Sequence, residues 1–271
     1  MTVTLLVLSV SAVLLALAIG VYCVAALDYA VETRITGMRE TNTLLAPVQQ
    51  AAALWYAPEN RTEVADTPAW RLAPILYLML AAMGLALVPW HAGFVPVDLS
   101  TGIVLWGAIE PLATVVIFLK GWAPNAHFPI LGAYRYVSLG LSYILVSMFV
   151  LIGVALPAES LQVSAVVDAQ AELWNVIRHP LGLPLFLIVG LGVSFWGPLN
   201  FVDADDLNGG ASAEDSGRVR LLWGIGRAAM LVSFAAIGAS AFLGGWHGPW
   251  LPGPVWLGLK TLALLLVLVY L

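Results

Sequence analysis

The sequence has little charge and almost no cysteine. Only 10% of its 271 residues are charged, whereas 61% are hydrophobic. Soluble domains carry about 25% charged residues, so this composition excludes an ordinary soluble globule and, equally, a disordered chain. The net charge of −5 has the wrong sign for binding nucleic acid. The single cysteine, Cys23, excludes an internal disulfide and a thiolate metal site. The class that remains is a polytopic membrane protein.

Seven apolar runs approach the length of about 20 residues that a helix needs to cross a bilayer. They cover residues 3–27, 72–90, 102–119, 131–156, 181–196, 221–243 and 255–271. Their apolar residues are consecutive, which fits helices and not the alternating strands of a barrel. We predict an all-α fold, a transmembrane helix bundle with about seven spans that forms one domain over residues 1–271. The last run ends without a polar flank, so we expect the natural chain to continue.

Lysine and arginine are distributed unequally between the two sides of these spans. With the N-terminus outside, the inner side holds eight of them, and the outer side holds only Arg178. The eight are Arg34, Arg39, Arg61, Arg71, Lys120, Arg135, Arg218 and Arg220. Basic residues favour the cytoplasmic side, so the sequence predicts a multi-pass protein of the cell inner (plasma) membrane with its N-terminus outside.

Most of the polar residues lie in two inner loops, 28–71 and 197–220. The second loop places five carboxylates within thirteen residues, which are Asp203, Asp205, Asp206, Glu214 and Asp215. Like charges at this density need solvent, protons or a cationic partner, so we expect this loop to dock on a peripheral subunit. No Glu follows at the spacing of a calcium loop, and the four histidines are scattered, so we predict no metal site.

Three ionisable residues fall inside the predicted spans, where charge is costly and usually functional. Lys260 and Arg227 lie near span ends and could extend to the interface. Glu110 lies too centrally for that, and Pro111 after it frees a backbone carbonyl. We therefore favour a proton-exchanging or cation-paired role for Glu110 over a structural one.

A series of motifs runs in order along the chain. The stretches are 121–135 (GWAPNAHFPILGAYR), 142–143 (SY), 151–154 (LIGV), 198–207 (PLNFVDADDL), 214–217 (EDSG), 244–246 (GGW), 251–253 (LPG) and Trp256 to Lys260; near the start, 32–34 (ETR), 44–47 (LLAP) and 72–74 (LAP). Together they resemble the H-type membrane component of NADH-quinone oxidoreductase, respiratory complex I. That family has eight helices, the last after a basic loop, and this chain lacks both.

The resemblance implies a membrane-anchor subunit of a redox-driven proton pump that carries no redox centre itself. Its inner loops would face peripheral iron-sulfur and quinone-site subunits, and other proton-pumping subunits and the lipid bilayer would surround it. A quinone would bind at the interface with the partner subunits. The residues that the resemblance implies for the quinone cavity and proton relay are Glu32, Arg34, Arg135, Tyr143, Asp203, Asp205, Asp206 and Glu214, with Arg34 and Arg135 as counter-charges.

Departures from the family pattern leave a second interpretation open. Residues 38–42 are a shortened form of the family's first-loop motif, and the amphipathic stretch 44–56 has neutral residues where the family has charges. Ile144 replaces a carboxylate, and Arg227 stands where the family has glutamate. These changes favour the equivalent subunit of a membrane-bound hydrogenase or ferredoxin-linked complex. A stand-alone transporter with Glu110 and Lys260 as its coupling pair is less favoured, since the sequence has no inverted repeat.

Overall fold

The structure is a computed structural model that describes residues 3–37 and 44–271, and this part of the chain contains helices and no strand. The longer helices are α1 (Val3–Thr36), α2 (Ala46–Tyr56), α3 (Thr67–Ala86), α4 (Gly102–Trp122), α5 (His127–Ala155), α8 (Gly182–Ser194), α9 (Gly217–Phe242) and α10 (Gly253–Tyr270). The short elements are α6 (Val163–Asp168), α7 (Asn175–Arg178) and the 3₁₀ turns η1 (Leu156–Ala158), η2 (Gly197–Leu199), η3 (Asp205–Leu207) and η4 (Gly210–Ser212). The all-α prediction is confirmed.

Six of the described helices are long and apolar enough to cross a membrane, whereas the sequence predicted about seven. The predicted span over 181–196 is instead α8, which has only 13 residues. At 1.5 Å per residue it is about 20 Å long, shorter than a bilayer core of about 30 Å. The helix ends because Phe195 adopts a left-handed backbone conformation, with φ of 56°. The chain then continues as irregular backbone and 3₁₀ turns up to α9.

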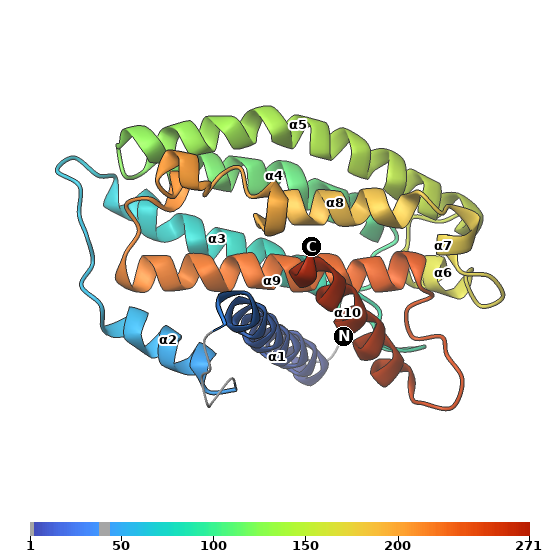
Figure 1. The fold of residues 1–271 in the computed structure, drawn as a ribbon. Coiled ribbons are helices and arrows are strands. Elements are labelled where there is room, and N and C mark those ends of the chain that lie inside the picture. Colours follow the sequence, from blue (N-terminus) through green and yellow to red (C-terminus); the bar gives the residue numbers. More distant parts are fainter. Residues whose placement is uncertain (1–2, 38–43) are drawn as a thin grey trace.

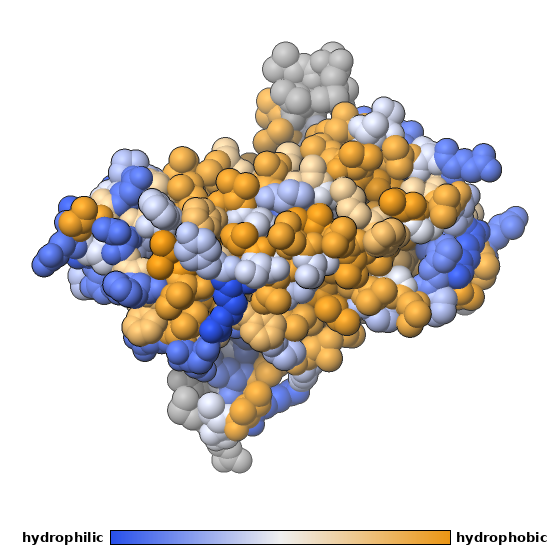
Figure 2. Space-filling model, turned by 90° about the horizontal axis from the view of Figure 1, so that it is seen from above, coloured by the Kyte–Doolittle hydropathy of each residue, from blue (hydrophilic) through white to orange (hydrophobic). Residues whose placement is uncertain are grey.

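Helix α9 forms the centre of the bundle. It is the most buried of the six long helices, and it contacts α1, α2, α3, α8 and α10. Its middle is rich in alanine, glycine and serine, which allow neighbouring backbones to approach closely. Figure 1 shows α3, α4, α5, α8 and α9 side by side, whereas α1 and α10 cross α9. Hydrophobic residues cover most of the middle of the face drawn in Figure 2, and hydrophilic residues gather toward its two ends.

The first predicted inner loop is more helical than expected. Helix α1 continues to Thr36, so Asp28, Glu32 and Arg34 lie on a helix and not in a loop. The predicted amphipathic stretch 44–56 forms α2 from Ala46 onward. The shortened motif at residues 38–42, with Arg39, lies outside the described residues.

Both predicted inner loops meet at one end of the bundle. The Asn60 amide donates a 2.5 Å hydrogen bond to the Ser216 hydroxyl, which joins the first loop to the start of α9. The Thr62 hydroxyl donates to the Pro124 carbonyl at 2.5 Å, and the Asp66 amide donates to the Ala123 carbonyl at 2.9 Å. We call this end, where segments 57–66, 123–126 and 201–216 lie, the loop face.

Candidate functional site

Helix α8 ends in the interior of the bundle, beside the middle of α9. Its last carbonyls meet Arg227, which is the eleventh residue of α9. Figure 1 shows the same arrangement, with α8 lying between α5 and α9 and ending partway along α9. Irregular backbone at membrane depth is tolerated only where protein or a polar cavity satisfies its hydrogen-bonding groups. The end of α8 therefore needs polar partners within the protein.

Arg227 and Tyr77 supply those partners. The Arg227 guanidinium donates to the carbonyls of Ser194 (3.4 Å) and Phe195, and the Tyr77 hydroxyl donates to the carbonyl of Val193. The C-terminal end of a helix carries a partial negative charge, so a cation at this point is electrostatically favourable. Arg227 is thus a cap for a helix that stops inside the protein, and its side chain does not extend to the interface.

Asp203 is the counter-ion of Arg227. One carboxylate oxygen accepts from Arg227 at 3.4 Å and from the Trp223 indole at 3.2 Å. The Asp203 amide donates to the Asn200 side chain at 3.2 Å, which fixes the turn that carries the carboxylate. The other carboxylate oxygen, Oδ1, is buried and has no partner among the described residues. An acceptor is therefore available in this site for a further donor.

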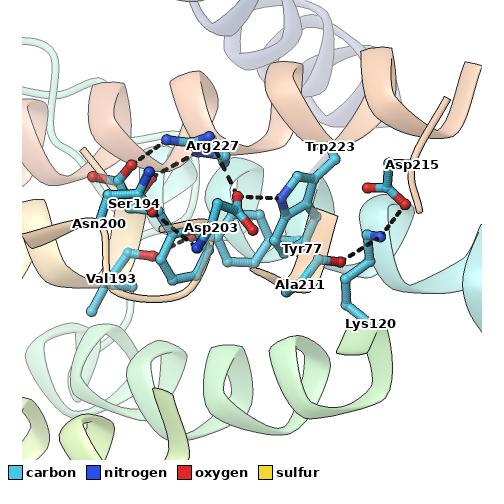
Figure 3. Close-up of polar contacts among 11 residues, drawn as sticks. Tyr77, Lys120, Val193, Ser194, Asn200, Asp203, Ala211, Asp215, Trp223 and Arg227 are labelled. Atoms are coloured by element: carbon cyan, nitrogen blue, oxygen red, sulfur yellow. Dashed lines mark hydrogen bonds and ion pairs between the residues drawn. The ribbon is translucent and has the colours of Figure 1, made fainter. Parts of the chain in front are cut away.

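A second ion pair lies on the other side of Trp223 (Figure 3). The Lys120 ammonium is 2.5 Å from Asp215 Oδ1, and both side chains are fully buried. The Trp70 indole donates to the same oxygen at 2.8 Å. Lys120 also lies 5.5 Å from the centre of the Trp223 ring, a cation–π distance. Trp223 therefore contacts both ion pairs, one through its N–H group and the other through its ring face.

An apolar cavity of about 790 Å³ opens beside Arg227. Residues from Leu14 to Asp28 line it along one face of α1, which corresponds to about 21 Å of helix. Pro47 to Leu54 of α2 form another wall, and α9 contributes residues from Arg220 to Ala228. The polar groups in the lining are Tyr22, Asp28, Gln50, Asn200, Arg220 and Arg227. A long apolar wall with a few polar groups suits an amphiphilic ligand.

Glu110 faces α5 from the middle of α4. Its carboxyl is buried, and the Ser147 hydroxyl donates to Oε1 at 2.5 Å. Its Oε2 has no partner among the described residues. Ser147 lies three residues beyond Ile144, so Glu110 projects toward the helix that carries Ile144. Glu110 and Lys260, both in the described part of the chain, do not form an ion pair with each other: Glu110 binds Ser147, and Lys260 binds the Gly245 carbonyl.

The residues predicted for the relay fall into separate places. Arg135 binds Asp206 through two hydrogen bonds of 3.0 and 2.8 Å, and these hold the pKa of that exposed carboxyl below its usual value. Arg34 instead donates to the Tyr270 hydroxyl at 2.8 Å, so it is not a counter-charge of the acidic loop here. Tyr143 packs near Tyr136, with ring centres 6.5 Å apart. The structure places Glu32 and Asp205 on the surface and leaves Glu214 half-buried.

The sequence interpretation missed the residues that join these parts. Lys120 was counted only as an inner-loop cation, and Asp215 only as one of several carboxylates. Tyr77, Trp70 and Trp223 were assigned no role from the sequence. The available signal in the sequence was the position of Lys120 directly after an apolar run. A lysine at such a position can become buried, and a buried lysine requires a partner. In the described residues, no group of three or more His, Cys, Asp or Glu side chains could hold a metal ion.

The described structure has six helices that could cross a membrane, a helix (α8) whose end is capped inside the protein, and a cavity that suits an amphiphilic ligand. Together these features define a multi-pass membrane protein with an internal polar site. Residues 3–271 match the NADH dehydrogenase family model, and the chain belongs to this family. It is 32% identical over 208 residues to an H-type component (numbered 1) of the NADH-quinone oxidoreductase of Rhodopseudomonas palustris (strain HaA2), covering 76% of this chain and 65% of that protein. It is 31% identical over 232 residues to the H-type component of the NADH-quinone oxidoreductase of Geobacillus kaustophilus, covering 84% of this chain and 70% of that protein. The chain thus spans about two thirds of the length of these relatives.

Proposed function

We propose that this chain is the membrane-anchor subunit of a complex-I-like oxidoreductase, and that its cavity binds a quinone at the interface with partner subunits. The observation that carries the proposal is the cavity, combined with family membership. The proposed orientation places the N-terminus outside the inner (plasma) membrane, with the loop face toward peripheral iron-sulfur subunits. The chain would link these subunits to other proton-pumping membrane subunits and carry no redox centre itself.

The lining of the cavity fits a quinone. Leu14, Leu17 and Leu78 are apolar and suit an isoprenoid tail. Arg220, Arg227 and Gln50 offer N–H donors for the carbonyl oxygens of a headgroup, and Asp28 offers an acceptor for a hydroxyl. A bound quinone would supply two-electron redox chemistry that takes up protons on reduction. This chain's own residues would bind it, exclude water and provide charged groups near the headgroup.

The polar groups beside the cavity support a role in responding to that proton uptake. Arg227 is shared between the cavity wall, the end of α8 and Asp203. A change of charge in the cavity alters the balance between these three contacts, because electrostatic interactions are strong where water is excluded. Trp223 then connects Asp203 to the Lys120–Asp215 pair. We propose this row, together with Arg135–Asp206, as the path by which the subunit senses cavity occupancy.

Glu110 is the proposed proton-exchanging group. It is a buried carboxyl with one oxygen bound to Ser147 and the other without a partner among the described residues. Its position opposite α5 supports the hypothesis that it substitutes for the carboxylate replaced by Ile144. The alternative is a permanently protonated, structural Glu110.

Photoaffinity labelling of the assembled complex tests the quinone proposal. An azido-quinone should label α1, α2 and the start of α9, and an excess of unmodified quinone should abolish this labelling. Ala51→Trp, which fills the cavity wall, should reduce labelling severalfold, whereas Val115→Trp on the exposed face of α4 should not. Labelling that is absent, or unaffected by Ala51→Trp, would reject the cavity as a quinone site.

The hydrogenase-type interpretation remains the second candidate, supported by the neutral α2 and by Ile144. It predicts that subunits co-purifying with the chain include a large subunit with a nickel site. The quinone-type interpretation predicts peripheral subunits without nickel. Mass spectrometry and metal analysis of the affinity-purified complex distinguish the two.

A further inference from the structure

The loop over residues 244–252 joins α9 to α10 at the end of α9 opposite the loop face. It contains no aspartate, glutamate, lysine or arginine. Trp250 in this loop is 98% exposed. Its φ of 78° lies in the left-handed region, which a bulky side chain rarely adopts. A strained backbone of this kind persists only where the surrounding structure enforces it.

Lys260 provides the main constraint on the loop. Its ammonium donates to the carbonyls of Gly245 at 2.9 Å and His247 at 2.6 Å. It also lies 4.5 Å from the ring centre of Trp174 and 5.8 Å from that of Trp256, so both rings face the cation. The Lys260 side chain is buried and has carbonyl, not carboxylate, partners in the described residues. The Lys260 ammonium therefore holds the backbone of the loop at these two carbonyls and forms no ion pair with the described residues.

Trp256 holds the second half of the loop. Its indole donates to the Pro249 carbonyl at 2.9 Å. Gly248 lies directly against its ring, where a Cβ atom would be 2.4 Å from the nearest ring carbon. The Leu251 amide donates to the same Pro249 carbonyl at 3.0 Å. The loop is thus pinned at three carbonyls, and Trp250 projects from a fixed backbone.

The exposed loop continues the outward apolar face of α10. Val255, Leu259, Leu262 and Leu266 are all exposed, and their spacing of four, three and four residues places them on one side of the helix. Leu251 is 45% exposed and lies next to Trp250. In a membrane-spanning helix such a face contacts lipid, so the loop lies where lipid chains meet headgroups.

We propose that the 244–252 loop is a membrane anchor that inserts Trp250 and Leu251 into the leaflet opposite the loop face, with Lys260 as its positioning residue. An indole is favoured in the interfacial region because its ring is apolar and its N–H group can bond to headgroups or water. The absence of aspartate, glutamate, lysine and arginine removes the cost of bringing their charges into this region. The proposal accounts for the exposure and conformation of Trp250 and for a buried lysine in α10.

Site-directed spin labelling in nanodiscs of neutral phospholipid tests the insertion. In a Cys23→Ser background, a nitroxide is attached at Trp250→Cys and, as a matched control, at Glu172→Cys, an exposed residue before α7. We expect the Trp250→Cys label to collide with oxygen several times more than with an aqueous nickel chelate, and the control to show the reverse. Equal access of the nickel reagent to both sites would overturn the proposal. Protection from both reagents in native membranes would also overturn it, because a protein would then cover the loop.

Lys260→Met tests the positioning role. Loss of its two carbonyl contacts should make the Trp250→Cys label more mobile and raise its access to the nickel reagent severalfold. Trp256→Phe removes the hydrogen bond to Pro249 and reduces the ring surface against Gly248 but keeps Lys260, so it serves as a milder variant if Lys260→Met does not fold. A label whose mobility and access are unchanged in the folded variant would show that Lys260 and Trp256 do not hold the anchor.

Discussion

The indole N–H of Trp223 binds Asp203, and the face of the same ring lies against Lys120, whose ammonium is paired with Asp215. One aromatic side chain therefore separates two ion pairs of the protein interior. The first pair caps the broken helix α8, and the second connects the end of α4 to the loop before α9 (Figure 3). The Lys120 and Asp215 side chains are fully buried, whereas Arg227 is 22% exposed and lines the cavity.

Lys120→Met should destabilise the protein by about 3–5 kcal/mol, because it leaves the Asp215 carboxylate uncompensated in the interior. Thermal unfolding in detergent measures the effect. The double variant Lys120→Met, Asp215→Leu should recover most of the loss, since no buried charge remains. A single variant as stable as the unchanged protein would show that the pair is not buried as described.

Arg227→Gln should expose the end of α8. The carbonyls of Ser194 and Phe195 lose a charge-assisted partner, at a cost of about 1.5–3 kcal/mol for such bonds. Hydrogen–deuterium exchange should increase in residues 193–204 and stay unchanged in α5. Arg220→Gln is the matched control, because Arg220 lies two turns earlier on α9 and has no hydrogen bond from its side chain to described residues. Similar exchange in both variants would argue against the capping role.

Glu110→Gln should leave assembly intact and lower proton translocation per electron in reconstituted vesicles. Glutamine can still accept the hydrogen bond from Ser147, but it cannot exchange a proton. Ser147→Ala is a useful companion, because it removes the bond and keeps the carboxyl. Normal pumping by Glu110→Gln would leave Glu110 as a structural residue.

The Arg135–Asp206 pair should persist from neutral pH to below about pH 4, the ordinary range of aspartate. Its hydrogen bonds to Arg135 lower the pKa of Asp206 in the folded protein, so their stabilising contribution is present above the unfolded pKa and disappears as the pH falls through the folded one. Exchange of residues 201–211, followed from pH 7 downward, measures this. Asp206→Asn should raise exchange at pH 7 and abolish the transition.

Asp205→Asn tests docking separately. The Asp205 carboxylate is exposed and has no partner in the described part of the chain, so its loss should leave exchange in residues 201–211 unchanged. If the acidic loop binds a basic partner, this variant should reduce the recovery of peripheral subunits in a pull-down. Full recovery with normal turnover would remove Asp205 from the interface.

The apolar runs of the sequence predicted six of the spanning helices closely, because a run of consecutive apolar residues satisfies its backbone in lipid as a helix, whereas the strands of a barrel alternate polar and apolar residues. The same criterion failed for residues 181–196. The sequence of an apolar run does not show whether its helix crosses the membrane or ends inside the protein. The end of α8 depends on the left-handed conformation of Phe195 and on capping residues that are distant in sequence. Arg227 and Tyr77, from two other helices, supply those caps.

Composition and motif order by themselves determined the membrane class and the family, since both depend on local residue types and spacing. Only the tertiary structure decided which charges are partners. Arg34 binds Tyr270 and not the acidic loop, Arg135 binds Asp206, and Lys120 binds Asp215 across 95 residues of sequence. The physical reason is that a charged side chain pairs with whichever group the packing of the helices brings within hydrogen-bond distance, and residue spacing along the chain does not encode that packing.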